Sequence, residues 1–195
     1  MMGTSTYKDS AKGEIYHIYN RGNHKKNIFL DNDDFSFYLL RLKTYSKENN
    51  FSIIAYCLMP NHIHLLLKQN STQCPQKLMA SLHTSYSKFF NKKYSQVGHL
   101  FQGRYKQKTL GSNEYASYLI GYIHLNPIKA NLCSEPQAYT WSSYKEYLET
   151  TTNNSMCDHQ LIQELGLFFD LSSSSVVISV LNKISPKEAF DDPQD

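Results

Sequence analysis

Two apolar runs separated by a Pro-Asn turn constrain the fold of this chain more than any other feature. Residues 51–58 (FSIIAYCL) form a nearly continuous apolar run, and residues 62–68 (HIHLLLK) form a second run directly after Pro60-Asn61. Short apolar runs that are rich in β-branched and aromatic residues and bounded by turn residues are typical of strands. The sequence therefore predicts a β-hairpin over residues 51–68.

The segments around this hairpin alternate between strand and helix patterns. Residues 15–20 (IYHIYN) are rich in β-formers and end at a turn, and a further strand is expected near residues 105–110. Apolar residues at helical spacing predict helices that begin near Asp31–Asp34, before Leu78 and at Glu114, with Pro127 ending or kinking the last one. The order strand, helix, strand, strand, helix, strand, helix predicts an α+β fold: a ferredoxin-like split βαβ antiparallel sheet with helices on one face.

Length and composition favour one globular domain followed by a small extension. The chain has 195 residues, and 41% of them are apolar, which is enough for a packed core. Beyond Glu149 the sequence becomes polar and serine-rich, so we expect a domain over residues 1–149 and a polar linker with a small helical C-terminal extension over 150–195. The four cysteines lack the spacing of a zinc site. Without a signal peptide or a run of membrane-spanning length, we expect a cytoplasmic protein that binds no membrane.

Two histidines lie two residues apart in the second strand of the hairpin. Residues i and i+2 of a strand share a face and lie about 6.6 Å apart, so His62 and His64 point the same way. Buried imidazoles need polar partners, and one metal ion bound to both would satisfy them together. The alternative is a pair of ordinary histidines that face a wet cleft, and the pair alone does not decide between the two.

The expected third helix carries a stripe of tyrosines that ends in an asparagine. Tyr115, Tyr118, Tyr122 and Asn126 recur three or four residues apart and therefore share one helical face. If this face covers the histidine face of the sheet, Asn126 can supply an oxygen ligand and Tyr122 stands beside the ion. Spacing alone does not select Tyr122, because most of the 15 tyrosines must serve in core packing.

Five motifs in collinear order carry a resemblance to a known family. They are Tyr19-Asn20-Arg21-Gly22-Asn23, Met59-Pro60-Asn61-His62-Ile63-His64-Leu65, Phe101-Gln102-Gly103-Arg104-Tyr105-Lys106, Tyr122-Ile123-His124-Leu125-Asn126-Pro127 and Trp141-Ser142-Ser143-Tyr144. Over roughly residues 14–148 the chain resembles the REP-associated tyrosine transposases, which belong to the single-tyrosine branch of the HUH endonucleases.

This resemblance implies a metal-dependent transposase-like enzyme that cleaves and rejoins single-stranded DNA at hairpins of palindromic repeats. In such enzymes the His-x-His pair binds Mg²⁺ or Mn²⁺, which maps onto His62 and His64, and the asparagine that maps onto Asn126 completes the metal shell. The tyrosine that maps onto Tyr122 attacks the DNA and forms a 5′-phosphotyrosine intermediate. Related insertion-sequence transposases work as dimers with exchanged helices, whereas the REP-associated type is regarded as monomeric. We therefore expect a monomer, with the dimer as the alternative.

Basic residues interleaved with aromatic ones form the candidate DNA-binding surface. The net charge is only +3, so the local distribution carries the argument. Cationic groups neutralise phosphates, and aromatic rings stack on unpaired bases. Arg104, Lys106 and Lys108 alternate along an expected strand and would share one face. We assign DNA binding to Arg21, Lys25, Lys26, Arg104, Tyr105, Lys106 and Lys108, and a solvated basic surface is the alternative.

Two other functions remain open at this point. One is a domesticated DNA-binding protein that recognises palindromic repeats without cleavage, although such a protein needs neither the histidine pair nor Tyr122. The other is a metal hydrolase in which water attacks the substrate. Covalent capture of DNA on the protein distinguishes a transesterase from both.

Overall fold

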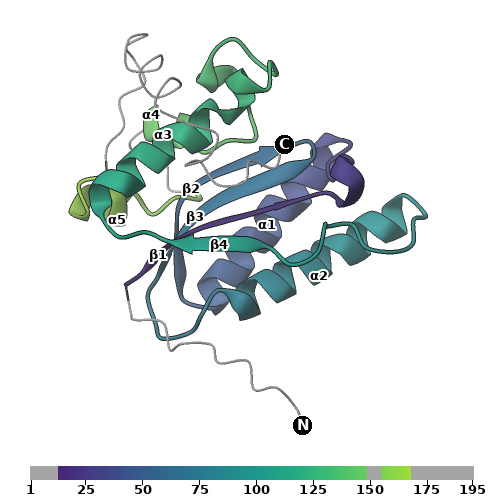
Figure 1. Cartoon of the computed structure of the whole chain (residues 1–195), viewed down its shortest axis with the longest axis horizontal. Coiled ribbons are helices and arrows are strands. Elements are labelled where there is room, and N and C mark those ends of the chain that lie inside the picture. The colour runs from purple at the N-terminus through teal and green to yellow at the C-terminus, as the bar shows by residue number, and fades with distance from the viewer. Residues whose placement is uncertain (1–12, 149–154, 168–195) are drawn as a thin grey trace.

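The sheet has the strand order expected from the sequence. A computed structural model describes residues 13–148 and 155–167, in which one antiparallel sheet has the order β2-β3-β1-β4. The strands are β1 (Ile15–Arg21), β2 (Phe51–Met59), β3 (His62–Gln69) and β4 (Lys106–Thr109). This order, with a helix after β1 and another after β3, is that of a ferredoxin-like fold. The predicted fold class is confirmed (Figure 1).

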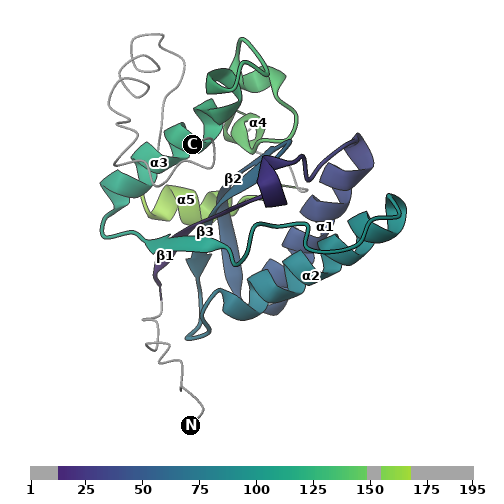
Figure 2. The ribbon, with the colours of Figure 1, turned by 45° about the vertical axis from the view of Figure 1, so that its right-hand side comes forward.

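Helices cover both faces of this sheet. The helices α1 (Asn32–Glu48) and α2 (Gln76–Lys93) lie side by side on one face, as expected, and α3 (Asn113–Lys129) lies over the opposite face (Figures 1 and 2). The reason is visible in β2 and β3, whose residues are almost all buried on both sides of the pleat, so both faces need cover. The shorter helices are η1 (Asn23–Lys25), η2 (Pro136–Ala138), α4 (Tyr144–Leu148) and α5 (His159–Glu164). In the described part of the chain, every helix is too short or too polar to cross a membrane.

Two aspartates fix the start of α1 and join it to α2. The Asp31 carboxylate accepts hydrogen bonds from two backbone N–H groups in the first turn, and the Asp34 carboxylate accepts from the N–H groups of Leu30 and Asp31. This reciprocal arrangement is a capping box. The fully buried Asp34 carboxylate also accepts a hydrogen bond from Lys93 Nζ in α2, at 2.9 Å. The capping bonds therefore set where α1 begins, and the contact with Lys93 joins α1 to α2.

Helix α3 begins at Asn113, one residue before the expected start at Glu114, and continues past its proline. Ser112 accepts a hydrogen bond from the backbone N–H of Tyr115, as an N-cap does. The helix then runs to Lys129, although we expected Pro127 to end or kink it near Asn126. The amide group of Asn126 lies 3.5 Å from the Ile123 carbonyl, for which Pro127 has no N–H donor.

The described part of the expected C-terminal extension packs onto the main sheet. Leu161 and Ile162 of α5 belong to the same hydrophobic core as β2. The N–H of Asp158 donates to the carbonyl of Ile53 at 2.9 Å, and Ser52 Oγ donates to the Asp158 carboxylate at 2.7 Å. The domain boundary at residue 149 stays a prediction, because residues 149–154 and 168–195 lie outside the described residues.

We predict that Asp34→Ala lowers the free energy of unfolding by about 2–4 kcal/mol, because it removes the buried acceptor of two backbone N–H groups and leaves Lys93 with the half-exposed Asp31 carboxylate, 2.6 Å away, as its hydrogen-bond acceptor. The neighbouring carboxylate of Asp33 is 87% exposed and lies 3.8 Å from Lys93 Nζ. Asp33→Ala is the matched control and should change stability by less than about 0.5 kcal/mol. Urea unfolding followed by circular dichroism measures both. Equal effects of the two substitutions would contradict the assignment.

Candidate active site

The two strand histidines lie on the sheet face that α3 covers. The ring centroids of His62 and His64 are 5.1 Å apart, with ring planes at 89°, and each residue is only 1% exposed. Tyr122 of α3 contacts His64 edge to face, with ring centroids 5.7 Å apart. The predicted arrangement, with the histidine pair on one face and the Tyr122 face of the helix above it, is therefore present.

Each imidazole of the pair has its Nδ1 atom engaged and its Nε2 atom unpaired. His62 Nδ1 lies 2.6 Å from Asn61 Oδ1, and His64 Nδ1 lies 3.1 Å from His17 Nε2. Because a carboxamide oxygen only accepts hydrogen bonds, Nδ1 of His62 carries the proton and Nε2 presents a lone pair. Both Nε2 atoms are buried and have no hydrogen-bond partner among the residues described by the structure.

Asn126 presents an oxygen from the helix face that Tyr122 occupies. Its Nδ2 group donates to the carbonyl of Tyr122 at 3.0 Å and, at the longer distance of 3.5 Å, to that of Ile123. Pro127 lacks the N–H group that would normally donate to the Ile123 carbonyl. The Asn126 side chain turns back to this part of the helix, and its buried Oδ1 atom has no partner within residues 13–148 and 155–167.

The donor set fits a divalent cation with open coordination positions. A buried polar atom without a partner costs on the order of 1–3 kcal/mol, and the site gathers two such nitrogens on β3 and one such oxygen on α3. Among the described residues, no group of three His, Cys, Asp or Glu side chains is placed to hold a metal. A third ligand of a bound cation would therefore be of another type, such as the side chain of Asn126. Two nitrogens and one oxygen suit six-coordinate Mg²⁺ or Mn²⁺ better than a closed tetrahedral zinc site.

Burial keeps these imidazoles in the neutral form. Desolvation lowers the pKa of His62 to about 4, with a smaller contribution from the charge of Arg21. Desolvation also lowers the pKa of His64 well below its usual value, and the neighbouring His62, His17 and Lys129 add to this effect. A neutral imidazole is the form that binds a metal ion, so the site offers its nitrogen lone pairs at neutral pH.

Two residues beside the site were not found from the sequence. His17 of β1 stacks on His64, with ring centroids 5.3 Å apart and planes at 13°, and its hydrogen bond fixes the orientation of that imidazole. Lys129 places its Nζ atom 4.4 Å from the centre of the Tyr122 ring. The sequence patterns that could have indicated these two residues are weak. His17 alternates with Tyr19 along a strand, and Lys129 lies two helical turns after Tyr122. Only the pairing of β1 with β3 and the placement of α3 give these spacings a meaning.

The other tyrosines of the α3 stripe, Tyr115 and Tyr118, lie nearer the start of the helix than Tyr122. Tyr118 stacks with Tyr115, with ring centroids 6.1 Å apart, and lines a surface pocket with Leu165 and Gly166. Both tyrosines are partly exposed. Tyr122 is 2% exposed and contacts His64, so the geometry separates it from the two that precede it.

The expected DNA-binding residues on β4 lie next to the histidine face. Lys106 and Lys108 are exposed and alternate along the strand. Lys106 Nζ lies 5.9 Å from the ring centre of Tyr19, which is directly opposite His64 in the strand register. Lys108 Nζ lies 5.2 Å from the ring centre of Tyr115 in α3. These two ammonium groups therefore border the site.

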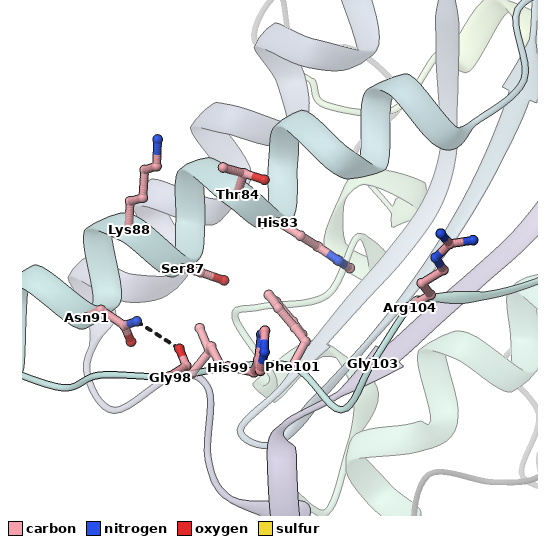
Figure 3. A pocket seen from close by; sticks show the side chains of 11 residues that line it. His83, Thr84, Ser87, Lys88, Asn91, Gly98, His99, Phe101, Gly103 and Arg104 are labelled. Atoms are coloured by element: carbon pink, nitrogen blue, oxygen red, sulfur yellow. Dashed lines mark hydrogen bonds between the residues drawn. The ribbon is translucent and has the colours of Figure 1, made fainter. Parts of the chain in front are cut away.

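Arg104 does not share this strand face, contrary to our expectation. The strand begins at Lys106 because the chain turns at Gly103, whose φ is +71°. Arg104 lines a pocket of about 660 Å³ with residues of α2, including His83 and Lys88 (Figure 3). Tyr105 contacts His83 edge to face, with ring centroids 6.4 Å apart. A role of Arg104 in binding DNA stays a prediction.

The remaining basic residues of the predicted surface lie near the end of β1. Arg21 is opposite His62 in the strand register, and its Nε atom donates to Gln102 Oε1 at 2.6 Å. Lys25 and Lys26 are exposed in and just after η1. Arg21 therefore stands beside the histidine pair, and the two lysines extend the positive charge beyond it.

Comparisons with known proteins find one matching family model and similar solved structures. A family model described as "Transposase IS200 like" matches residues 10–126. The structure is similar to that of a REP-associated tyrosine transposase bound to a REP hairpin, at 13% identity and a TM-score of 0.58, over 80% of this chain and 94% of that one. A putative transposase from Deinococcus radiodurans is similar at 16% identity and a TM-score of 0.44, over 60% of this chain and 93% of that one. No curated protein matches the chain.

We predict that His17→Phe weakens Mn²⁺ binding roughly 10- to 100-fold, because the residue that orients a metal-binding histidine affects affinity to this extent. His64→Ala should remove binding altogether. His83→Phe on α2 is the control, since it replaces another histidine of lowered pKa away from the pair. Calorimetric titration of each folded variant with Mn²⁺ measures the effect. Unchanged affinity in His17→Phe would show that His64 needs no partner on β1.

Proposed function

Because the chain belongs to the IS200-like transposase family, we propose that it is a metal-dependent transesterase that cleaves and rejoins single-stranded DNA beside hairpins. The observation that carries this proposal is the contact of Tyr122 with His64, which shares a strand face with His62, both with an unpaired Nε2 atom. A nucleophile beside a cation site is the arrangement that phosphoryl transfer to a tyrosine requires.

Tyr122 is the proposed nucleophile. Its phenolic oxygen attacks the scissile phosphorus as the phenolic proton is lost, and the bond from phosphorus to the 3′ oxygen breaks. The products are a 5′-phosphotyrosine link and a free 3′-hydroxyl group. Because the covalent link conserves the energy of the phosphodiester bond, a second 3′-hydroxyl group can reverse the reaction without ATP. The ammonium group of Lys129 beside the Tyr122 ring attracts an anionic phosphate to this position.

The proposed ligands of Mg²⁺ or Mn²⁺ are His62 Nε2, His64 Nε2 and Asn126 Oδ1. When bound, such an ion neutralises charge that develops on the phosphate and aligns the scissile bond. The chain itself prepares the ligands. Asn61 and His17 orient the two imidazoles, and the hydrogen bond from the Asn126 amide to the helix backbone leaves its oxygen available. All three side chains are buried, so their positions are set before substrate arrives.

The proposed substrate is a single strand that carries a hairpin. The similar solved structure is bound to a REP hairpin, and Lys106 and Lys108 border the catalytic face of this chain. Two cations on one strand face, next to the rings of Tyr19 and Tyr115, suit a phosphate backbone with unpaired bases. Incubation with hairpin-bearing single strands and Mn²⁺, followed by a denaturing gel, tests the proposal through the appearance of a protein–DNA adduct.

We predict that Tyr122→Phe abolishes the covalent adduct while folding and DNA binding survive, because the change removes one oxygen and little packing volume. Tyr118→Phe, one turn earlier on the same helix, is the matched control and should still form the adduct. Mass spectrometry of the DNA-linked peptide identifies the modified residue. A nucleotide on Tyr118 would overturn the assignment, and cleavage without any adduct would indicate attack by water.

We predict that Lys106→Gln and Lys108→Gln each weaken binding to all hairpin sequences alike. Each lost phosphate contact should reduce the slope of log affinity against log salt concentration by about 0.7–1 unit. Arg104→Gln tests whether the separate pocket beside α2 also binds the DNA backbone. Lys43→Gln on α1 is the control. Fluorescence anisotropy at several salt concentrations measures the slopes. An effect confined to one base position would contradict backbone binding.

A further inference from the structure

The Trp141–Tyr144 segment wraps around the edge of the sheet and contacts both helical layers. The Trp141 ring stacks on Phe35 of α1, with centroids 4.6 Å apart and planes at 8°. The Trp141 carbonyl accepts from the N–H of Leu58, and the N–H of Ser143 donates to the carbonyl of Tyr56, so the segment pairs with the outer edge of β2. Beyond this edge, Ser143 reaches His124 of α3.

The hydroxyl group of Ser143 uses all of its hydrogen-bonding capacity. It accepts from the backbone N–H of Tyr56 at 2.9 Å and donates to the carbonyl of the same residue at 3.2 Å. Its remaining lone pair lies 2.8 Å from His124 Nε2. Since a hydroxyl group has one proton to donate, the proton of the third bond comes from His124. Ser143 is 0% exposed, so this bond forms away from water.

His124 holds α3 from the side opposite the catalytic site. It lies two residues from Tyr122 and two from Asn126, which is about 200° around a helix. Tyr122 contacts His64 on one side of α3, while the His124 ring lies edge-on to Tyr144 and Tyr147 on the other, with ring centroids 5.5 and 4.9 Å away. A bond at this point fixes both the rotation of α3 and its depth above the sheet.

The sheet surface beneath Tyr122 gives a physical reason for such a bond. It carries His62 and His64 instead of the aliphatic side chains that line the other face of β3. Apolar contact is non-directional, and here part of it is replaced by polar atoms without partners. A hydrogen bond is directional, so it defines the orientation of α3 more narrowly. Displacement of a reacting group by about 1 Å can lower a rate 10²-fold.

We infer that the His124–Ser143 hydrogen bond is a latch that positions Tyr122 and Asn126 over the histidine pair, with the Trp141–Tyr144 segment as the element that carries it. His124 and Ser143 are positioning residues, since neither lies on the catalytic side of α3. The inference rests on the proposed function, because it assigns the segment a role in that reaction.

The test compares His124→Leu, which removes the donor, with His124→Gln, which keeps an N–H group near the position of Nε2. In single-turnover reactions with saturating hairpin DNA and Mn²⁺, we expect His124→Leu to form the adduct about 10²-fold more slowly with unchanged DNA affinity. His124→Gln should recover most of the rate. Ser143→Ala should be slow as well, although it also removes the two contacts of this hydroxyl group with Tyr56. The double variant with His124→Leu should be no slower than the slower single variant, because both changes remove the same His124–Ser143 bond.

The control is Tyr86→Phe, which removes a buried hydrogen bond to the carbonyl of Ile28 on the other side of the sheet and should leave the rate unchanged. Hydrogen exchange is measured without DNA or metal. Relative to the wild-type chain, His124→Leu should increase the exchange rate of backbone amides in α3 more than in α1. A wild-type rate in folded His124→Leu, or additive effects in the double variant, would overturn the latch. If the wild-type chain forms no adduct, the proposed function fails, and unchanged α3 exchange in His124→Leu would then refute the latch separately.

Discussion

The structure depends on a polar surface that is buried between β3 and α3. His62, His64 and Asn126 lie in the interior with donor or acceptor atoms that the described residues leave unpaired. Each such atom opposes folding, so the rest of the fold must supply the compensating stability. The opposite face does so with an aliphatic and aromatic core beneath α1 and α2. A cation that binds the folded form alone would offset part of the cost by mass action, which makes folding and the proposed catalysis depend on the same three atoms.

The sequence predicted the elements whose burial pattern is local. The hairpin and the helices follow from apolar periodicity and turn residues, the ferredoxin-like sheet follows from the succession of strands and helices along the chain, and the shared face of His62 and His64 follows from strand geometry. The spacing of Tyr115, Tyr118, Tyr122 and Asn126 placed them on one helical face, and only the resemblance distinguished Tyr122 from the other tyrosines. The contact of Tyr122 with His64 now gives a structural reason for that distinction.

Features that depend on contacts between distant segments could not be predicted. His17 becomes part of the site because β1 pairs with β3 and brings its imidazole to His64. The separation of Arg104 from Lys106 depends on a single left-handed glycine, Gly103, which ends the expected alternation before the strand begins. The helix α3 continues past Pro127, and near the Ile123 carbonyl, for which Pro127 has no donor, lies the Asn126 amide group at 3.5 Å. In each case the deciding feature is a side-chain contact or a turn that the apolar periodicity of the sequence does not indicate.

The segment from Tyr122 to Pro127 combines chemistry and positioning within about one and a half helical turns. Tyr122 and Asn126, four residues apart, face the histidine pair, and His124 between them faces Ser143 on the opposite side. The Asn126 amide group donates to the helix backbone, and its buried oxygen has no partner among the described residues. A helix with alternate residues committed to opposite sides cannot rotate without breaking one set of contacts. These two sets of contacts explain how α3 can hold Tyr122, the proposed nucleophile, in one orientation although the sheet surface beneath it is polar.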